Sequence, residues 1–212
     1  MTRLLKCPPR EIKDVKEKAF QRAIYHNKEA IIPPIAGKST RAVVNWYSFE
    51  SPIDKYREKN STSRGSSNVD LIGKDIISNH FVVCEVKFSC NINDSPEDAA
   101  KEALHYFNVI VSDADQLDNV ATHHKEETLF SWTEIDPNET ELWIVANADY
   151  WSYWIDGKKK AIPEFAVEDG VRKRVRCFSL DIPGYFFKEQ KGDLEFYIPE
   201  IPKATVWTEL IV

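Results

Sequence analysis

The sequence predicts an α/β protein with a mixed central β-sheet and helices packed on its faces. Residues 69–75 and 81–89 are neighbouring apolar segments of strand length, and the second alternates in period two. Residues 95–111 begin with Ser-Pro-Glu-Asp, a strong helix start, and continue with apolar residues at helical spacing. Along the chain the order is helix, strand, polar loop, strand, strand, helix, strand. This order is typical of a sheet covered by helices.

The composition favours one folded domain. The chain has 212 residues, of which 42% are hydrophobic and 29% are charged, with a net charge of −6. We expect a core at about 9–146 and a β-rich C-terminal elaboration at about 147–212. Neither a transmembrane run nor the apolar core of a signal peptide stands out, so we expect an intracellular protein without a membrane partner. None of the four cysteines has a CxxC spacing, which argues against a zinc site.

The N-terminal part is expected to hold a helix, a strand and a polar loop. Residues 9–26 repeat apolar side chains at helical spacing, with Glu11 on the edge of that face and Glu17 on its flank. Residues 42–47 are β-branched and aromatic, which predicts a strand. A short helix is the expectation for the polar residues 50–59. The Ser-rich residues 60–68 predict a loop.

The strand expected at 81–89 carries two charges on one side. Glu85 and Lys87 alternate with apolar residues, and Asp70 lies on the preceding strand. A carboxylate and an ammonium inside a fold are costly unless they have a partner or a function. These three residues are therefore the best functional candidates in the chain.

The remaining segments are expected as follows. Residues 112–140 are acidic and predict irregular structure, whereas 141–146 predict a strand and 172–180 a strand with a basic start. Tyr150, Trp151, Tyr153 and Trp154 form an aromatic cluster, best interpreted as core, then as a dimer interface, then as a base-stacking platform. Residues 158–160 are a basic turn, and 194–212 contain short extended pieces.

Asp70, Glu85 and Lys87 together suit metal-assisted hydrolysis. Two carboxylates on adjacent strands can converge on Mg²⁺, which prefers oxygen ligands. Lys87 could orient a water molecule and stabilise a charged transition state. The alternative is a structural ion pair. Residues 1–60 hold 13 Lys and Arg against 7 Asp and Glu, whereas 101–150 hold 2 against 11, so the chain could carry a basic face for phosphates.

Asp70, followed by Glu85-Val86-Lys87, resembles the signature of the PD-(D/E)XK nuclease superfamily, which has the restriction-endonuclease-like fold. Residues 66–72 and 85–89 are similar, more narrowly, to archaeal Holliday-junction resolvases, which have a Ser-bearing loop before the Asp. Length, composition and motif are also similar to those of small proteins of archaeal spindle-shaped viruses assigned as nucleases. The resemblance covers about residues 9–146. The chain departs from it at Val69, where the Pro of the family's name would stand.

This resemblance implies an endonuclease that hydrolyses DNA phosphodiester bonds with Mg²⁺ (or Mn²⁺), acting on branched or duplex DNA as a homodimer, inside a host cell if the source is viral. Asp70, Glu85 and Lys87 would be catalytic. Asp70 and Glu85 would bind the metal with a first-helix glutamate, for which Glu11 is the choice and Glu17 the second. The candidates for substrate binding are Arg64, Ser66, Ser89, Lys101, Lys158, Lys159, Arg172 and Arg174.

Two other classes of protein fit the same residues. One is a non-catalytic DNA-binding or assembly protein that retains the nuclease fold without turnover, which the negative net charge favours. The other is an unrelated α/β scaffold in which Glu85 and Lys87 form a structural ion pair. The intact set of Asp70, Glu85 and Lys87 favours the enzyme over both.

Overall fold

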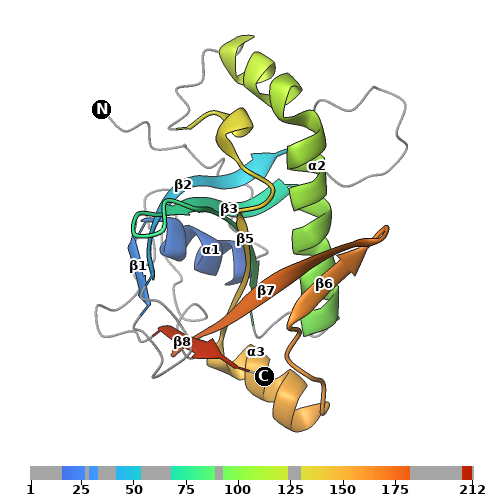
Figure 1. Cartoon of the computed structure of the whole chain (residues 1–212). Coiled ribbons are helices and arrows are strands. Elements are labelled where there is room, and N and C mark those ends of the chain that lie inside the picture. The colour runs from blue at the N-terminus through green and yellow to red at the C-terminus, as the bar shows by residue number, and fades with distance from the viewer. Residues whose placement is uncertain are drawn as a thin grey trace.

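The computed structural model describes residues 16–26, 29–32, 42–53, 68–88, 93–123, 130–181 and 207–211. Figure 1 shows their arrangement. The elements in chain order are α1 (Lys16–His26), β1 (Glu29–Ile32), β2 (Ala42–Pro52), β3 (Asn68–Asp75), β4 (Phe81–Lys87), α2 (Pro96–His123), the 3₁₀-helix η3 (Trp132–Glu134), β5 (Glu141–Asn147), α3 (Ala148–Trp151), the π-helical η4 (Ser152–Gly157), β6 (Phe165–Glu168), β7 (Val171–Leu180) and β8 (Trp207–Leu210).

One mixed sheet organises these elements. The strand order is β1-β2-β3-β4-β5-β7-β6, and β8 pairs with β7 as well. The pairs β1–β2, β2–β3 and β3–β4 are antiparallel. The pairs β4–β5 and β5–β7 are parallel, and β6 and β8 run antiparallel to β7. The expected α/β class and mixed sheet are therefore confirmed. The parallel strands β4 and β5 are joined through α2, as a parallel pair requires a long crossover.

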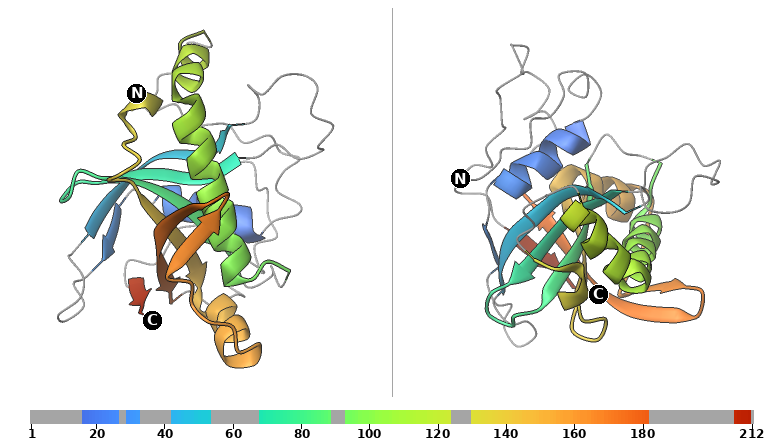
Figure 2. Two further views of the ribbon diagram at one scale, coloured as in Figure 1. Left: turned by 45° about the vertical axis from the view of Figure 1, so that its right-hand side comes forward. Right: turned by 90° about the horizontal axis from the view of Figure 1, so that it is seen from above.

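Helices cover both faces of the sheet (Figure 2). Helix α1 packs Phe20 and Ile24 against the side of β4 that carries Cys84 and Val86. Helix α2 covers the opposite side, to which Val83 belongs. The expected alternation along β4 is thus confirmed, and the whole strand is buried. Because Glu85 and Lys87 alternate with Cys84 and Val86, they share the side of α2.

Glycine at position 73 allows β2 and β3 to pack closely. A Cβ atom there would lie 2.7 Å from the side chains of both Trp46 and Val44, too close for either to keep its place. Trp46 in turn packs edge to face against Trp143 of β5, with ring centroids 6.2 Å apart. The absence of a side chain at Gly73 therefore leaves room for the pair of Trp46 and Trp143.

Two expected boundaries were wrong. Helix α2 continues to His123 rather than ending near residue 111, so residues 112–123 are helical and not irregular. The physical reason is that the buried stripe continues through Leu117, and Asp118 then accepts hydrogen bonds from Trp132 and Thr133 of η3. Strand β2 continues to Pro52, so residues 50–52 extend the strand and do not begin a helix. Residues 9–15, 54–59 and 60–67 lie outside the described residues.

The C-terminal third adds strands to the same sheet. Strand β7 pairs with β5 from Val175 to Leu180, and β8 pairs with the end of β7. Of the aromatic cluster, Tyr150, Trp151 and Trp154 are buried in the core on the α2 side, as the first interpretation expected. Strand β6 was not expected from the sequence. Strand β6 has four residues, and its pairing partner is β7, which follows it directly after a turn.

Candidate functional site

Neighbouring strands bring Asp70 and Glu85 together. Leu71 of β3 pairs with Cys84 of β4, so the next position of the antiparallel pair places Asp70 opposite Glu85. The backbone N–H of Val86 donates a hydrogen bond to Oδ2 of Asp70 at 2.8 Å, which holds this carboxyl against β4. Asp70, Glu85 and Lys87 are 9%, 3% and 3% exposed. The three predicted residues therefore form one buried cluster.

The carboxyl groups of Asp70 and Glu85 lie close enough to interact directly. A hydrogen bond between them would require one of the two to carry a proton. Burial raises the pKa of Asp70 to about 7, in spite of the Val86 hydrogen bond and the charge of Lys87. Burial, and then the charge of Asp70, raise the pKa of Glu85 well above its usual value. Oε2 of Glu85 is buried and has no hydrogen-bond partner among the described residues. Such a pair needs a shared proton or a bound cation.

Lys87 is held next to these acids as a cation. Its Nζ lies 2.8 Å from Oε1 of Glu85. Burial by itself lowers the pKa of Lys87, but the charges of Glu85 and Glu102 outweigh it and the net pKa is raised. Lys87 therefore keeps its proton at neutral pH and can donate hydrogen bonds but cannot act as a base.

Helix α1 contributes Glu17 to this cluster. Its Oε2 accepts a hydrogen bond from the backbone N–H of Phe88 at 3.1 Å, at the end of β4. Its charge also contributes to the raised pKa of Asp70. Glu11, the first choice from the sequence, lies outside the described residues. Of the two first-helix glutamates, Glu17 is the one that the structure places at the cluster.

Asp94, Glu102 and Tyr106 are further members that the sequence did not reveal. Lys87 Nζ lies 2.9 Å from Oε2 of Glu102 and 3.5 Å from Oδ2 of Asp94. The hydroxyl of Tyr106 donates to Oε1 of Glu102 at 2.7 Å. The available signal was the spacing of four between Glu102 and Tyr106, which places both on one face of a helix. Nothing in the sequence pairs that face with Lys87.

The candidate substrate-binding residues separate into two groups. Lys101, Lys158 and Lys159 are exposed. Lys158 and Lys159 lie in a turn after α3, and the hydroxyl of Tyr150 in α3 donates a hydrogen bond to the carbonyl of Asp94. They lie toward the end of the sheet that carries Lys87. Lys101 pairs with Glu97 at 2.9 Å.

Arg172 and Arg174 are exposed at the start of β7. Lys87 aligns with Ala146 of β5 and so with Ser179 of β7, which places both arginines several residues toward the opposite end of the sheet. Arg64, Ser66 and Ser89 lie outside the described residues, so these candidates remain predictions from the sequence.

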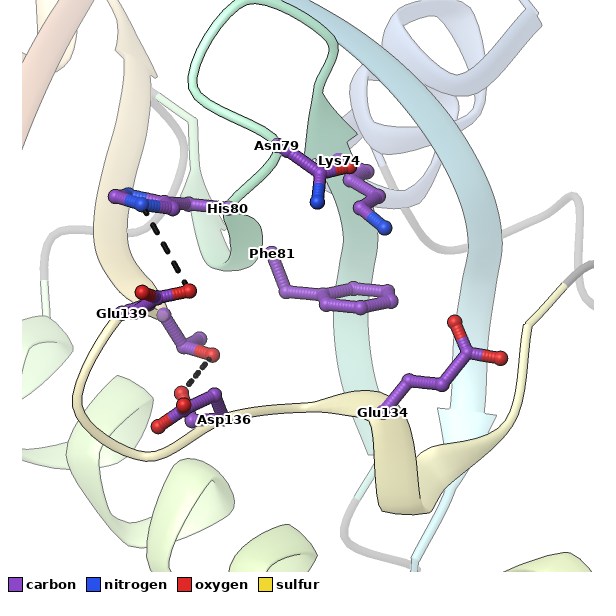
Figure 3. A pocket seen from close by; sticks show the side chains of 8 residues that line it. Lys74, Asn79, His80, Phe81, Glu134, Asp136 and Glu139 are labelled. Atoms are coloured by element: carbon purple, nitrogen blue, oxygen red, sulfur yellow. Dashed lines mark hydrogen bonds and ion pairs between the residues drawn. The ribbon is translucent and has the colours of Figure 1, made fainter.

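A surface pocket lies at the end of the sheet opposite to Lys87 (Figure 3). It has a volume of about 250 Å³, and Lys74, Asn79, His80 and Phe81 of the β3–β4 hairpin line one side. The ammonium of Lys74 lies over the ring of Phe81 at 4.8 Å. Because Phe81 begins β4 and Lys87 ends it, this pocket is separate from the acidic cluster.

Within the described ranges, no group of three or more His, Cys, Asp or Glu side chains is arranged to hold a metal ion. The candidate metal ligands in the described chain remain Asp70 and Glu85, with Glu17 at the end of β4. In the same ranges no helix is long and apolar enough to cross a membrane.

The comparisons with known proteins add no relative. No family model, no curated protein and no solved structure matches this chain. The function of this protein is therefore inferred from the geometry of the cluster.

Proposed function

We propose that this protein is a metal-dependent DNA endonuclease of the PD-(D/E)XK type, with resolvase-like or structure-selective activity. The observation that carries the proposal is the buried cluster of Asp70, Glu85 and Lys87, with an acid oxygen that lacks a donor. The order of elements around the cluster supports it, because a helix and four strands precede α2 and a further strand follows. A homodimer would suit a branched substrate.

Asp70 and Glu85 would hold the cation in this proposal. Their oxygens are the ligands that Mg²⁺ and Mn²⁺ prefer, and the unpaired Oε2 of Glu85 fits such a role. When bound, the cation lowers the pKa of a coordinated water and offsets the charge that develops on phosphorus. The strand pair supplies rigidity, since the Val86 N–H holds Asp70 in place.

Lys87 would act as a charged donor. Because its pKa is raised, its ammonium can orient the attacking water and stabilise the transition state, while the proton of that water leaves to another acceptor. In-line attack forms the new P–O bond and breaks the bond to the 3′ oxygen, which takes up a proton. The products are a 5′-phosphate and a 3′-hydroxyl.

Lys101, Lys158 and Lys159 are the described candidates that would hold the DNA backbone near the cluster. Exposed lysines contact phosphates without reading sequence, so they would set affinity and salt dependence. Arg172 and Arg174 would contact a duplex only at a distance from the cleaved bond, given their place at the other end of β7.

The deciding experiment is a cleavage assay with the purified full chain and Mg²⁺ or Mn²⁺. The substrates are four-way-junction, flap, single-stranded and linear duplex DNA, and the variants are Asp70→Ala and Lys87→Ala. We expect wild type to cut at least one substrate and each variant to be slower by about 100-fold or more. Asp115→Asn, which alters an exposed carboxylate on α2, is the control and should cut as wild type does.

Equal cutting by wild type and both variants would contradict the proposal and indicate a contaminating nuclease. Binding of DNA by all three proteins without cutting would favour the non-catalytic DNA-binding or assembly protein. Neither binding nor cutting would favour the scaffold in which Glu85 and Lys87 form a structural ion pair.

A further inference from the structure

Three carboxylates surround the ammonium of Lys87. Nζ lies 2.8 Å from Oε1 of Glu85, 2.9 Å from Oε2 of Glu102 and 3.5 Å from Oδ2 of Asp94. An ammonium has three N–H donors, so each can face one of these acids. The side chains of Lys87 and Glu85 are 4% exposed, whereas that of Glu102 is 38% exposed. Lys87 therefore lies between an interior acid, which also contacts Asp70, and an acid near the surface.

Tyr106 orients Glu102 toward Lys87. Its hydroxyl donates to Oε1 of Glu102, which leaves Oε2 of the same carboxylate for Lys87. Glu102 and Tyr106 are four residues apart on α2, so the helix fixes their relative positions. Burial, and then Glu102, raise the pKa of Tyr106 above its usual value, so this hydroxyl remains a donor. Both oxygens of Glu102 thus have assigned partners.

A cation at Asp70 and Glu85 would change the position of Lys87. A divalent ion and an ammonium repel each other strongly over a few ångströms in a buried site. Glu85 would turn its charge to the ion, and Lys87 would lose its nearest partner. A buried ammonium without an acceptor is costly, so Lys87 must keep another acid to remain in place. Glu102 is already at hydrogen-bond distance and is the member of the three that Tyr106 holds.

We propose that Glu102 is a positioning residue that retains Lys87 when Glu85 binds the cation, and that Tyr106 orients Glu102 for this role. This inference rests on the proposed nuclease function and extends it to two residues of α2. Glu102 acts through Lys87 and touches neither the cation nor the DNA. Its removal should therefore matter only when Lys87 is present.

The test measures binding of Mg²⁺ alone to the full chain by calorimetry, in a double-mutant cycle of Glu102→Gln and Lys87→Ala. Without Glu102, Lys87 competes with the ion for Glu85, so we expect Glu102→Gln to weaken binding by about 10-fold. In the Lys87→Ala background the same change should have no effect, because the competitor is gone. Tyr106→Phe should weaken binding in the same direction by a smaller factor. Asp115→Asn, which removes an exposed charge from the same helix, should leave binding unchanged.

Steady-state cleavage supplies a second readout. We expect Glu102→Gln to lower kcat by about 10- to 100-fold with an unchanged KM for DNA. A purely structural role would lower the melting temperature and leave kcat of the folded fraction intact, which would overturn the inference. If Glu102→Gln does not fold, Tyr106→Phe carries the same test.

The remaining outcomes are also decisive. Equal weakening of Mg²⁺ binding by Glu102→Gln in both backgrounds would show that Glu102 attracts the ion directly, and the positioning role would be wrong. Unchanged binding and kcat in Glu102→Gln and Tyr106→Phe would overturn the inference while leaving the nuclease proposal intact. If wild type itself neither binds Mg²⁺ nor cuts DNA, the proposed function fails, and the role of Glu102 fails with it.

Discussion

Burial gives single side chains of the cluster their unusual properties. Asp70 and Glu85 are acids that favour the protonated form, and Lys87 is a base that favours the charged form. Burial disfavours the charged form of all three side chains, and only at Lys87 do the neighbouring charges, those of Glu85 and Glu102, outweigh burial. In the proposed function, a cation would take the place of the proton that these acids hold.

Asp70 should therefore destabilise the protein when no metal is bound. The pKa of Asp70 is about 7 in the folded state, above its usual value of about 3.9. Between these two pH values the folded state binds more protons than the unfolded state, so the free energy of unfolding falls as pH rises. We expect Asp70→Asn, measured with a chelator at pH 8, to raise the free energy of unfolding by on the order of 2 kcal/mol. The gain should shrink toward pH 5, where wild-type Asp70 is protonated.

Thermal unfolding of both proteins at pH 5 and pH 8 checks this expectation. Asp115→Asn is the matched control, because it removes an exposed carboxylate and should show no such dependence on pH. A lower melting temperature for Asp70→Asn at pH 8 would mean that the Asp70 carboxylate stabilises the fold.

At the scale of elements, the hairpin that joins β3 to β4 determines the register that brings Asp70 to Glu85. Asp75 ends β3 and accepts hydrogen bonds from the backbone N–H of Val43, Ile77 and Ser78. It also accepts one from the hydroxyl of Ser78 at 2.7 Å. One carboxylate thus ties the turn to β2.

Asp75→Ala should lower the free energy of unfolding by about 1–3 kcal/mol, because it leaves the buried N–H of Val43 without an acceptor. Burial opposes the charged form of Asp75, but the four hydrogen bonds outweigh it and the pKa is lowered. The stabilisation is therefore present above about pH 4 and is lost as pH falls through the lowered pKa.

Denaturant unfolding of wild type and Asp75→Ala at pH 7 and pH 3 measures this difference, with Asp115→Ala as the exposed control. A difference that is as large at pH 3 as at pH 7 would show that the charge of Asp75 is irrelevant to its role.

At the scale of the whole molecule, Arg176 joins three strands. Its guanidinium donates to Glu141 of β5 at 2.8 Å, and to Glu209 of β8 at 2.8 Å and 3.0 Å. It also lies 5.2 Å from the ring centroid of Trp143. This residue connects the C-terminal strand to the sheet that carries the acidic cluster.

Arg176→Leu should lower the free energy of unfolding by about 3–5 kcal/mol, because it leaves the largely buried carboxylate of Glu209 without its partner, whereas Glu141 keeps the indole N–H of Trp143. Hydrogen exchange should increase at residues 207–210 first, since β8 loses its side-chain contact with β7 and keeps only the backbone pairing. Arg174→Leu, two residues earlier and exposed, should change stability by less than about 0.5 kcal/mol. If both variants are equally stable, the ion pairs of Arg176 contribute nothing to the attachment of β8.

The amino-acid sequence was sufficient for the α/β class, for strands β3, β4 and β5, and for the start of α2. It also singled out Asp70, Glu85 and Lys87, because period-two alternation shows which side a strand residue takes and a charge in an apolar strand is conspicuous. These patterns are local, so they can be recognised within one segment of the sequence without knowing which element packs against it.

Only the tertiary structure brought Glu17 to the end of β4 and placed Asp94, Glu102 and Tyr106 around Lys87. It also extended α2 to His123 and joined β7 and β8 to the sheet. Glu102 and Lys87 are separated by 15 residues along the chain, and their contact depends on how α2 packs over β4. Arg176 and Glu209 are separated by 33 residues. From the sequence, a charged residue on a helix is predicted to be exposed to solvent. Its neighbour on another element is determined by tertiary packing, which no local sequence pattern encodes.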